Sequence, residues 1–193
     1  MSKNRLEAFS DGVIAIIITI MVLELKVPHD STPTALLDLA PVFGSYVLSF
    51  VFIGIYWNNH HHLLHAVHQV SGGTLWANLH LLFWLSLVPF AAGWMGENHF
   101  AQWPVALYGV ILLMAGVGYF ILSRTLIALH GGKSPLATAI GGDFKGQISL
   151  VLYAVAIPLS FVNRWIAIGL YVIVAVMWLV PDPRIERVLR SET

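Results

Sequence analysis

The chain has 193 residues, of which 58% are hydrophobic and only 10% are charged, and its mean hydropathy is +0.77. A soluble domain carries about 25% charged residues, so this composition indicates an integral membrane protein. The formal net charge of zero gives no indication of a nucleic-acid partner, and the absence of cysteine excludes disulfide and thiolate chemistry. We expect a single all-α polytopic domain over residues 1–193, embedded in a lipid bilayer.

The first predicted helix covers about residues 4–27 and ends at Pro28. Its uncharged part, from Gly12 to Leu23, reaches only about 18 Å, whereas the core of a bilayer is about 30 Å thick. To span the membrane, this helix must place Asp11, and with it Glu24, at or inside the polar boundary. A carboxylate at that depth usually faces a bundle interior or a wet cavity, so this helix is the candidate functional element.

Five more apolar segments follow along the chain. They predict transmembrane helices at about 41–64, 75–95, 104–126, 147–162 and 165–180, separated by polar or glycine-containing linkers. With six helices in total, both termini lie on the same side of the membrane.

The basic residues are distributed unequally between the two sides. The side of the termini carries Lys3, Arg5, Arg124, Lys133, Lys145, Arg184, Arg187 and Arg190, whereas the opposite side carries only Lys26 and Arg164. Because positive residues accumulate in cytoplasmic loops, this asymmetry predicts that both termini are cytoplasmic.

A narrow stripe runs along the first helix. At 100° per residue it consists of Arg5, Gly12, Ile16, Thr19 and Leu23, with Phe9 and Ile20 on its shoulder. Apart from Arg5 and one hydroxyl the stripe is apolar, so by itself it is equally compatible with ordinary helix packing.

Asp11 lies roughly 120° around the helix axis from Arg5, so the two are not natural partners. We therefore expect Asp11 to find its partner on another helix. Asn78 and His80 lie at a similar depth on the third helix and are candidate partners for Ser10 and Asp11.

Residues 58–68, with the sequence NNHHHLLHAVH, contain five histidines. His61, His65 and His68 are spaced i, i+4, i+7, a spacing that would suit zinc on one helix face. No carboxylate or cysteine is nearby in sequence, and histidines at a membrane boundary can equally hydrogen-bond to neighbouring helices. We predict no metal site and no cofactor, and we keep a zinc-dependent membrane protein as an alternative.

Residues 116–120, GVGYF, partly match the T-V-G-Y-G filter whose carbonyls replace the water shell of potassium. The first Thr and the last Gly are missing and the segment lies within a helix, so we interpret it as a small-residue packing patch. No nucleophile–base pair, phosphate loop or H-E-x-x-H motif is found, and we predict that the protein is not an enzyme.

The first helix resembles a known signature, Arg5-x-x-x-Phe9-Ser10-Asp11 followed by GVIAIIITIMVLEL. This is the signature of the transmembrane-protein-175 family, the endosomal and lysosomal potassium channels and their prokaryotic relatives. Looser similarities are Tyr56-Trp57 before His60–His62, and Asn78 with Leu82-Phe83 and Pro89-Phe90.

In that family, animal members carry two six-helix repeats and act as dimers, whereas single-repeat prokaryotic proteins form tetramers. The resemblance therefore implies a homotetrameric potassium channel of modest selectivity in a prokaryotic cell (inner) membrane. Four copies of the first helix would line the pore without a carbonyl filter. The matching pore-lining positions are Ile16, Thr19, Ile20 and Leu23, with Ile16 at the narrowest ring, where an apolar lining can gate by dewetting.

The resemblance also implies a network that ties the pore helix to its neighbours near the cytoplasmic end. Its members from the motif would be Arg5, Phe9, Ser10 and Asp11, and their partners Trp57, His60, His61, His62 and Asn78. A proton-coupled secondary transporter that uses Asp11 or Glu24 remains the main alternative, although such transporters usually show inverted repeats and broken helices, and no repeat is evident in the sequence.

Overall fold

The computed structural model describes residues 2–131, 134, 136–137 and 143–179, and within these ranges all regular secondary structure is helical. The helices are α1 (Lys3–Leu23), α2 (Pro33–Asp38), α3 (Ala40–His65), α4 (Gly72–Ser86), α5 (Val88–Glu97), α6 (Gln102–His130), α8 (Phe144–Val162) and α9 (Arg164–Leu179). By length and hydropathy α1, α3, α4 with α5, α6 and α8 can each cross a membrane, and α9 is a shorter apolar helix. The predicted all-α membrane architecture is confirmed.

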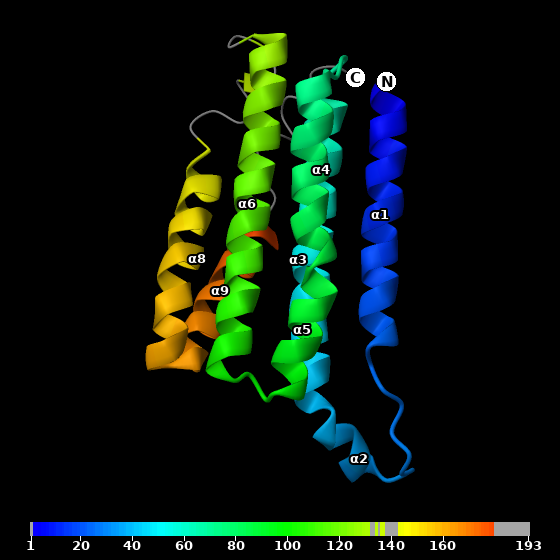
Figure 1. Ribbon diagram of the computed structural model, residues 1–193, viewed down its shortest axis with the longest axis vertical. Helices are drawn as coiled ribbons and strands as arrows, with labels where there is room; N and C mark the ends of the chain where they lie inside the picture. Colours follow the sequence, from blue (N-terminus) through cyan, green and yellow to red (C-terminus); the bar gives the residue numbers. More distant parts are fainter. Residues whose placement is uncertain (1, 132–133, 135, 138–142, 180–193) are drawn as a thin grey trace.

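The long helices run side by side in one bundle, with α1 at one edge and α8 at the opposite edge (Figure 1). Helix α1 packs against α3, α4 and α5, whereas α8 and α9 pack against each other and against α6. A helix at the edge of a bundle meets neighbours on one side only. One long face of α1 therefore has no partner among the residues of the subunit that the structure describes.

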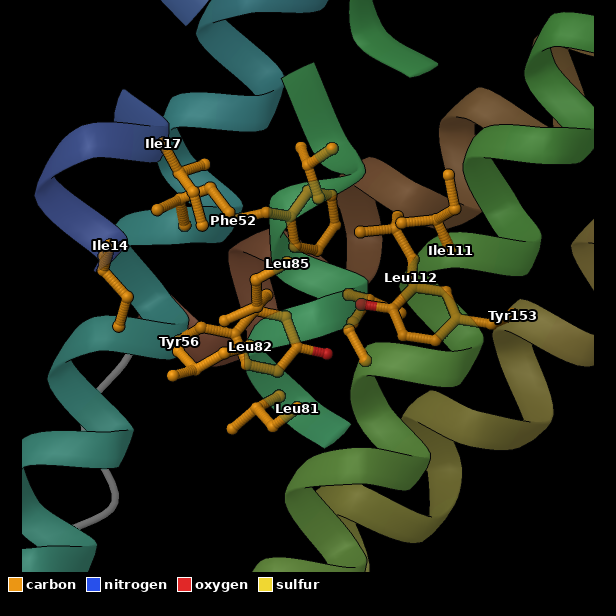
Figure 2. Close-up of a cluster of buried hydrophobic side chains, with 14 of the residues drawn as sticks. Ile14, Ile17, Phe52, Tyr56, Leu81, Leu82, Leu85, Ile111, Leu112 and Tyr153 are labelled. Carbon is orange, nitrogen blue, oxygen red and sulfur yellow. The ribbon is translucent and has the colours of Figure 1, made fainter. Parts of the chain in front are cut away.

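The interior of the bundle is filled by side chains from α1, α3, α4, α6 and α8. Figure 2 shows part of this core, with Ile14, Phe52, Leu81, Leu112 and Tyr153 among the labelled residues, all of them at most 3% exposed. Because lipid tails are as apolar as leucine, association of these helices depends on close van der Waals packing and on interhelical hydrogen bonds.

Close packing is visible where α4 crosses α6. A Cβ atom added at Gly118 would lie 3.0 Å from the Cα of Leu81, which is tighter than most Cβ contacts, so glycine favours this close approach of the two backbones. The position belongs to the segment that the sequence identified as a small-residue patch. Here glycine sets the separation of two helices.

Several helix bounds differ from the predicted ones. Helix α1 ends at Leu23, with Glu24 as its C-cap, and not at 27. The predicted linker after α1 contains the short helix α2, with Pro33 in its first turn. The predicted end of the last helix, residue 180, lies outside the described residues.

The predicted third helix, 75–95, begins earlier, at Gly72, and is interrupted at Leu87. Pro89 lies in the first turn of α5, and a proline has no N–H to donate back to the carbonyl four residues before it. After the break the segment also changes its main neighbour, since α4 packs chiefly against α6 and α5 chiefly against α3.

Candidate functional site

Helix α1 has two faces of opposite character. Its buried face consists of Leu6, Ser10, Ile14, Ile17 and Met21, all turned towards the bundle. On the other face Ile16, Ile20 and Leu23 are 60%, 43% and 75% exposed. Thr19 is exposed on this face as well. The four residues that the sequence singles out as pore-lining thus lie on the face that the subunit leaves uncovered.

Thr19 is the only hydroxyl among those four residues. It donates a hydrogen bond to the carbonyl of Ala15 at 2.9 Å. Its proton is therefore used within the helix, and the oxygen lone pairs remain available on the exposed face. Such an oxygen can accept from water or contact a cation without leaving an unsatisfied donor behind.

A groove of about 540 Å³ runs along this face, between α1 and the α4–α5 segment. Ile16 and Ile20 line it from α1, Glu24 lines it directly after this helix, and Phe90 and Glu97 line it from α5. Glu97 also accepts a hydrogen bond from Lys26 at 2.6 Å. This contact raises the pKa of the Lys26 ammonium above its usual value, first through the hydrogen bond and then through the charge of Glu97.

A buried chain of hydrogen bonds joins α1, α3 and α4. The His60 Nε2 donates to the Asn78 Oδ1 at 2.7 Å, since an amide oxygen can only accept. The Asn78 Nδ2 donates to the Ser10 Oγ at 2.9 Å, and Ser10 donates to the carbonyl of Leu6 at 2.8 Å. All three side chains are at most 1% exposed. This series of hydrogen bonds fixes the rotation of α1 against its two neighbours.

A second set of contacts joins α1 to α3 on either side of Ser10. The indole of Trp57 donates to the Asp11 Oδ1 at 3.0 Å, and the His61 Nδ1 lies 3.2 Å from the Glu7 Oε1. The rings of Trp57 and His61 are stacked, with their centroids 6.1 Å apart. Two carboxylates of α1 are thus held by two stacked rings of α3.

Most of the predicted network residues meet in these two sets. His62 packs the edge of its ring against His61, with 5.7 Å between centroids. Arg5 and Phe9 are exposed, and neither makes a hydrogen bond or ion pair with another described residue of the subunit. Glu7 was not predicted, although it lies one helical turn before Asp11 and its position on the same face could have indicated its role.

His80 is not a partner of Ser10 or Asp11, contrary to the expectation from its depth. Its ring contacts α6, where a Cβ atom on Gly118 would lie 3.3 Å from the His80 Cδ2, and it packs against Trp84. Asn78 alone reaches Ser10, because it occupies the face of α4 that turns towards α1. His80, two residues further along, points away from that face.

The predicted histidine face does not form as one unit. Helix α3 ends at His65, so His68 lies in the following loop. There the backbone N–H groups of His68 and Gln69 donate to the His130 Nε2, at 3.3 and 3.4 Å. Among the described residues no group of three or more His, Cys, Asp or Glu side chains is placed to hold a metal ion.

Comparison with known proteins gives consistent matches. The family model described as "Endosomal/lysosomal potassium channel TMEM175" matches residues 5–89. A protein of Chryseobacterium sp. named a potassium channel is 55% identical over 99% of this chain and 100% of its own length. A potassium channel of Chamaesiphon minutus is 31% identical over 90% of this chain and 91% of its own length.

Animal proteins match over a smaller part of their length. The bovine endosomal/lysosomal proton channel TMEM175 is 27% identical over 83% of this chain, which corresponds to 37% of the bovine protein. The crystal structure of a lysosomal potassium-selective channel TMEM175 homolog from Chamaesiphon minutus superposes with a TM-score of 0.80 at 29% identity. It covers 92% of this chain and 96% of the other.

The family model begins at the first residue of the α1 signature and extends into α5. It therefore includes the exposed face of α1 and both sets of contacts that hold this helix. The full-length bacterial match and the superposed structure extend the similarity to the remaining helices. This multi-pass membrane protein is a cation channel and not an enzyme, and it belongs to the TMEM175 family.

Proposed function

We propose that the chain forms a homotetrameric, potassium-permeable channel in a bacterial cell membrane, with its N-terminal end facing the cytoplasm. Four copies of α1 line the pore, Ile16 forms its narrowest ring, and Thr19, Ile20 and Leu23 continue the lining. The observation that carries the proposal is the uncovered face of α1. It holds these four residues and lies opposite the face that Ser10, Ile14 and Ile17 bury.

A single subunit offers no enclosed path along this face, since Ile16 and Leu23 are largely exposed. An ion path therefore requires several copies of α1 around a common axis. The groove between α1 and α5 leaves room beside the stripe for side chains of an adjacent copy. The names of the bacterial relatives, which match nearly the whole chain, support potassium as the permeant ion.

Selectivity in such a pore would follow from dehydration. An apolar ring offers no oxygen ligands in place of water, so an ion must pass it partly stripped. Sodium holds its water more tightly than potassium, and its passage costs more free energy. Without a filter of carbonyl groups the preference for potassium stays modest.

Proton permeation is a second candidate, because the animal relatives are named proton channels. A proton-coupled transporter that uses Asp11 or Glu24 is a third. Asp11 is engaged with Trp57 and lies off the exposed stripe, which favours a structural role. Glu24 follows directly after α1 and lines the groove.

Purified protein in liposomes distinguishes these candidates. A channel gives single-channel currents and a reversal potential that follows the potassium gradient, with a smaller response to sodium. A proton channel gives currents that follow the pH gradient when both potassium and sodium are replaced by a large cation. Saturable uptake that requires a proton gradient would contradict both channel proposals. The oligomer mass in detergent tests the tetramer.

A further inference from the structure

The end of α6 is joined to the loop between α3 and α4 by a single imidazole. His130 is the last residue of α6, and its Nδ1 lies 2.9 Å from the carbonyl oxygen of Leu126, one turn earlier. Its Nε2 accepts the backbone N–H groups of His68 and Gln69, at 3.3 and 3.4 Å. Neither N–H group has another backbone acceptor among the described residues. Both ring nitrogens are therefore in use.

These contacts allow only one protonation state of the His130 ring. A carbonyl oxygen can only accept, so Nδ1 must carry a hydrogen, and a backbone N–H can only donate, so Nε2 must present its lone pair. The ring is thus the neutral tautomer with its hydrogen on Nδ1. A second proton can bind only at Nε2, where it would point at two N–H groups and remove the acceptor that they share.

The segment held by His130 is short. Val67, on one side of it, is fully buried. On the other side, Ser71 and Thr74 form the capping box that starts α4. Both ends of the loop are thus fixed without His130, and movement after loss of its two contacts is confined to residues 68–70. Their N–H groups can then bind water in place of the ring nitrogen.

The same segment lies beside the start of α1. A groove of about 600 Å³ has residues 67–70 on one side and Ser2, Lys3 and Asn4 on the other. The Lys3 Nζ also donates to the carbonyl of His65, the last residue of α3, at 3.4 Å. Figure 1 shows the start of α1 and the end of α6 at the same end of the bundle. A change at His130 can therefore reach the first turn of α1 through three loop residues.

The charged and titratable groups on the elements around His130 give its charged form no ion pair. They are Lys3 on α1, His65 at the end of α3, His68 in the loop, His80 on α4, Arg124 on α6 and Asp143 at the start of α8. The ion pairs among the described residues are those of Lys26 with Glu97 and of His61 with Glu7, and neither involves His130. No described carboxylate thus replaces the contacts that protonation of His130 removes.

We propose that His130 is a pH-sensitive contact that controls the support of α1. In its neutral form it holds residues 68–70 against the end of α6, and uptake of a proton at Nε2 releases them. Histidine is the side chain that ordinarily changes its charge between about pH 5 and 8. The effect on ion flow rests on the proposed function. A pore of four α1 helices needs all copies in the same orientation, so acid on the side of the N-terminal ends should reduce potassium flux.

The tautomer is tested directly on the full-length protein in lipid bilayers. Magic-angle-spinning NMR of protein labelled with ¹⁵N-histidine reports which ring nitrogens carry hydrogen, and the signals that disappear in His130→Gln identify His130. We expect hydrogen on Nδ1 alone at pH 8 and on both nitrogens at pH 5.5. A neutral ring with its hydrogen on Nε2 at pH 8, or a ring that is still neutral at pH 5.5, would overturn the proposal.

Hydrogen exchange measures release of the loop. After correction for the intrinsic exchange rate, protection of the amides of residues 68–70 should fall about tenfold or more between pH 8 and pH 5.5, since two hydrogen bonds are lost. His130→Gln keeps an oxygen that can accept but takes up no proton, so its protection should not depend on pH. His130→Lys carries a charge at both pH values and should give low protection at both.

His68→Gln is the matched control for exchange. It removes a titratable imidazole from the same loop and keeps the backbone N–H that His130 accepts. Its protection should therefore fall with pH as that of the wild type does. If wild type and His130→Gln showed the same dependence on pH, His130 would not be the group that releases the loop.

Potassium flux across planar bilayers tests the step from the loop to the pore. With acid on the side of the N-terminal ends, flux through the wild type should fall about threefold or more, the usual effect of one lost hydrogen bond, and flux through His130→Gln should stay constant. An equal response of both proteins would overturn this step. Absence of potassium flux at every pH would instead contradict the proposed function, while NMR and hydrogen exchange still decide whether His130 releases the loop.

Discussion

The indole nitrogen of Trp57 on α3 lies 3.0 Å from the Asp11 Oδ1 on α1, and its N–H is donated to that carboxylate. The second long helix thus holds the acidic residue of the first at a fixed angle around the helix axis. Asp11 is half-buried and lies off the stripe that contains Ile16 and Thr19. The contact therefore sets which residues of α1 face outwards, without placing the carboxylate among them.

Replacing Asp11 tests this structural role. Asp11→Ala removes the acceptor of the Trp57 N–H, and a hydrogen bond to a charged group is worth about 1.5–3 kcal/mol. We expect a lower thermal stability and a lower yield of assembled protein, measured by melting and size-exclusion chromatography, while assembled channels keep their ion preference. Trp57→Phe should act in the same way, and Trp76→Phe, on an exposed indole, should have no effect. A stable, assembled Asp11→Ala protein with a changed reversal potential would place Asp11 in the ion path.

Ile16 and Ile17 provide a matched pair for the proposed pore face. Ile16 is 60% exposed and Ile17 is 3% exposed. Ile16→Asn should hydrate the narrowest ring, increase conductance and reduce the preference for potassium over sodium. Ile17→Asn instead places an amide in the packed core, and should destabilise the fold by about 1–3 kcal/mol if the amide stays unpaired. Conductance and permeability ratios in planar bilayers check the first, and thermal melting checks the second. Unchanged permeability in an assembled Ile16→Asn channel would mean that another face of α1 lines the pore.

Asn78 connects two buried partners, so its removal should be more harmful than the loss of a local hydrogen bond. Asn78→Ala leaves His60 without an acceptor and Ser10 without a donor, and each buried group left unpaired costs about 1–3 kcal/mol. Ser123→Ala is the control, since the hydrogen bond that this hydroxyl donates to the carbonyl of Tyr119 stays within its own helix. A double-mutant cycle of Ser10→Ala with Asn78→Ala, followed by melting, should give a coupling energy that differs from zero. Additive effects would show that the 2.9 Å contact contributes nothing.

From the contact between Lys26 and Glu97 we predict how the stability of the protein changes at high pH. The pKa of Lys26 is raised in the folded protein, so the contact stabilises the fold below the ordinary lysine value of 10.5 and loses this effect as the pH rises through the higher folded value. Both side chains are exposed, which keeps the contribution small and sensitive to salt. Lys26→Met should therefore reduce the fall in melting temperature between pH 8 and pH 11, and 1 M salt should remove the difference between the two proteins. If the melting temperature of Lys26→Met fell more than that of the wild type over this pH range, the prediction would be wrong.

The period of 3.6 residues groups Ile16 and Thr19 on one face of α1 and Ile14 and Ile17 on another, but it does not say which face lines a pore. The choice of the Ile16 face comes from the resemblance to the TMEM175 signature. The partners of α1 could not be derived in this way. Whether Asn78 or His80 reaches Ser10 depends on the rotation of α4 between α1 and α6, and this rotation is not visible in the sequence pattern. The break at Leu87 lies two residues before Pro89. The sequence nevertheless predicts one helix over 75–95, because the apolar pattern continues through the break.

The hydrogen bond between Ser10 and Asn78 joins residues that are 68 positions apart in the chain. At a synthesis rate of about 5–20 residues per second, α1 waits roughly 3–14 s after its own translation for this partner. During that interval its polar groups must be accommodated by the insertion machinery or by the lipid headgroups. The rotation of α1 against its neighbours is thus fixed only after α4 has been synthesised, although α1 is by itself long and apolar enough to cross a membrane.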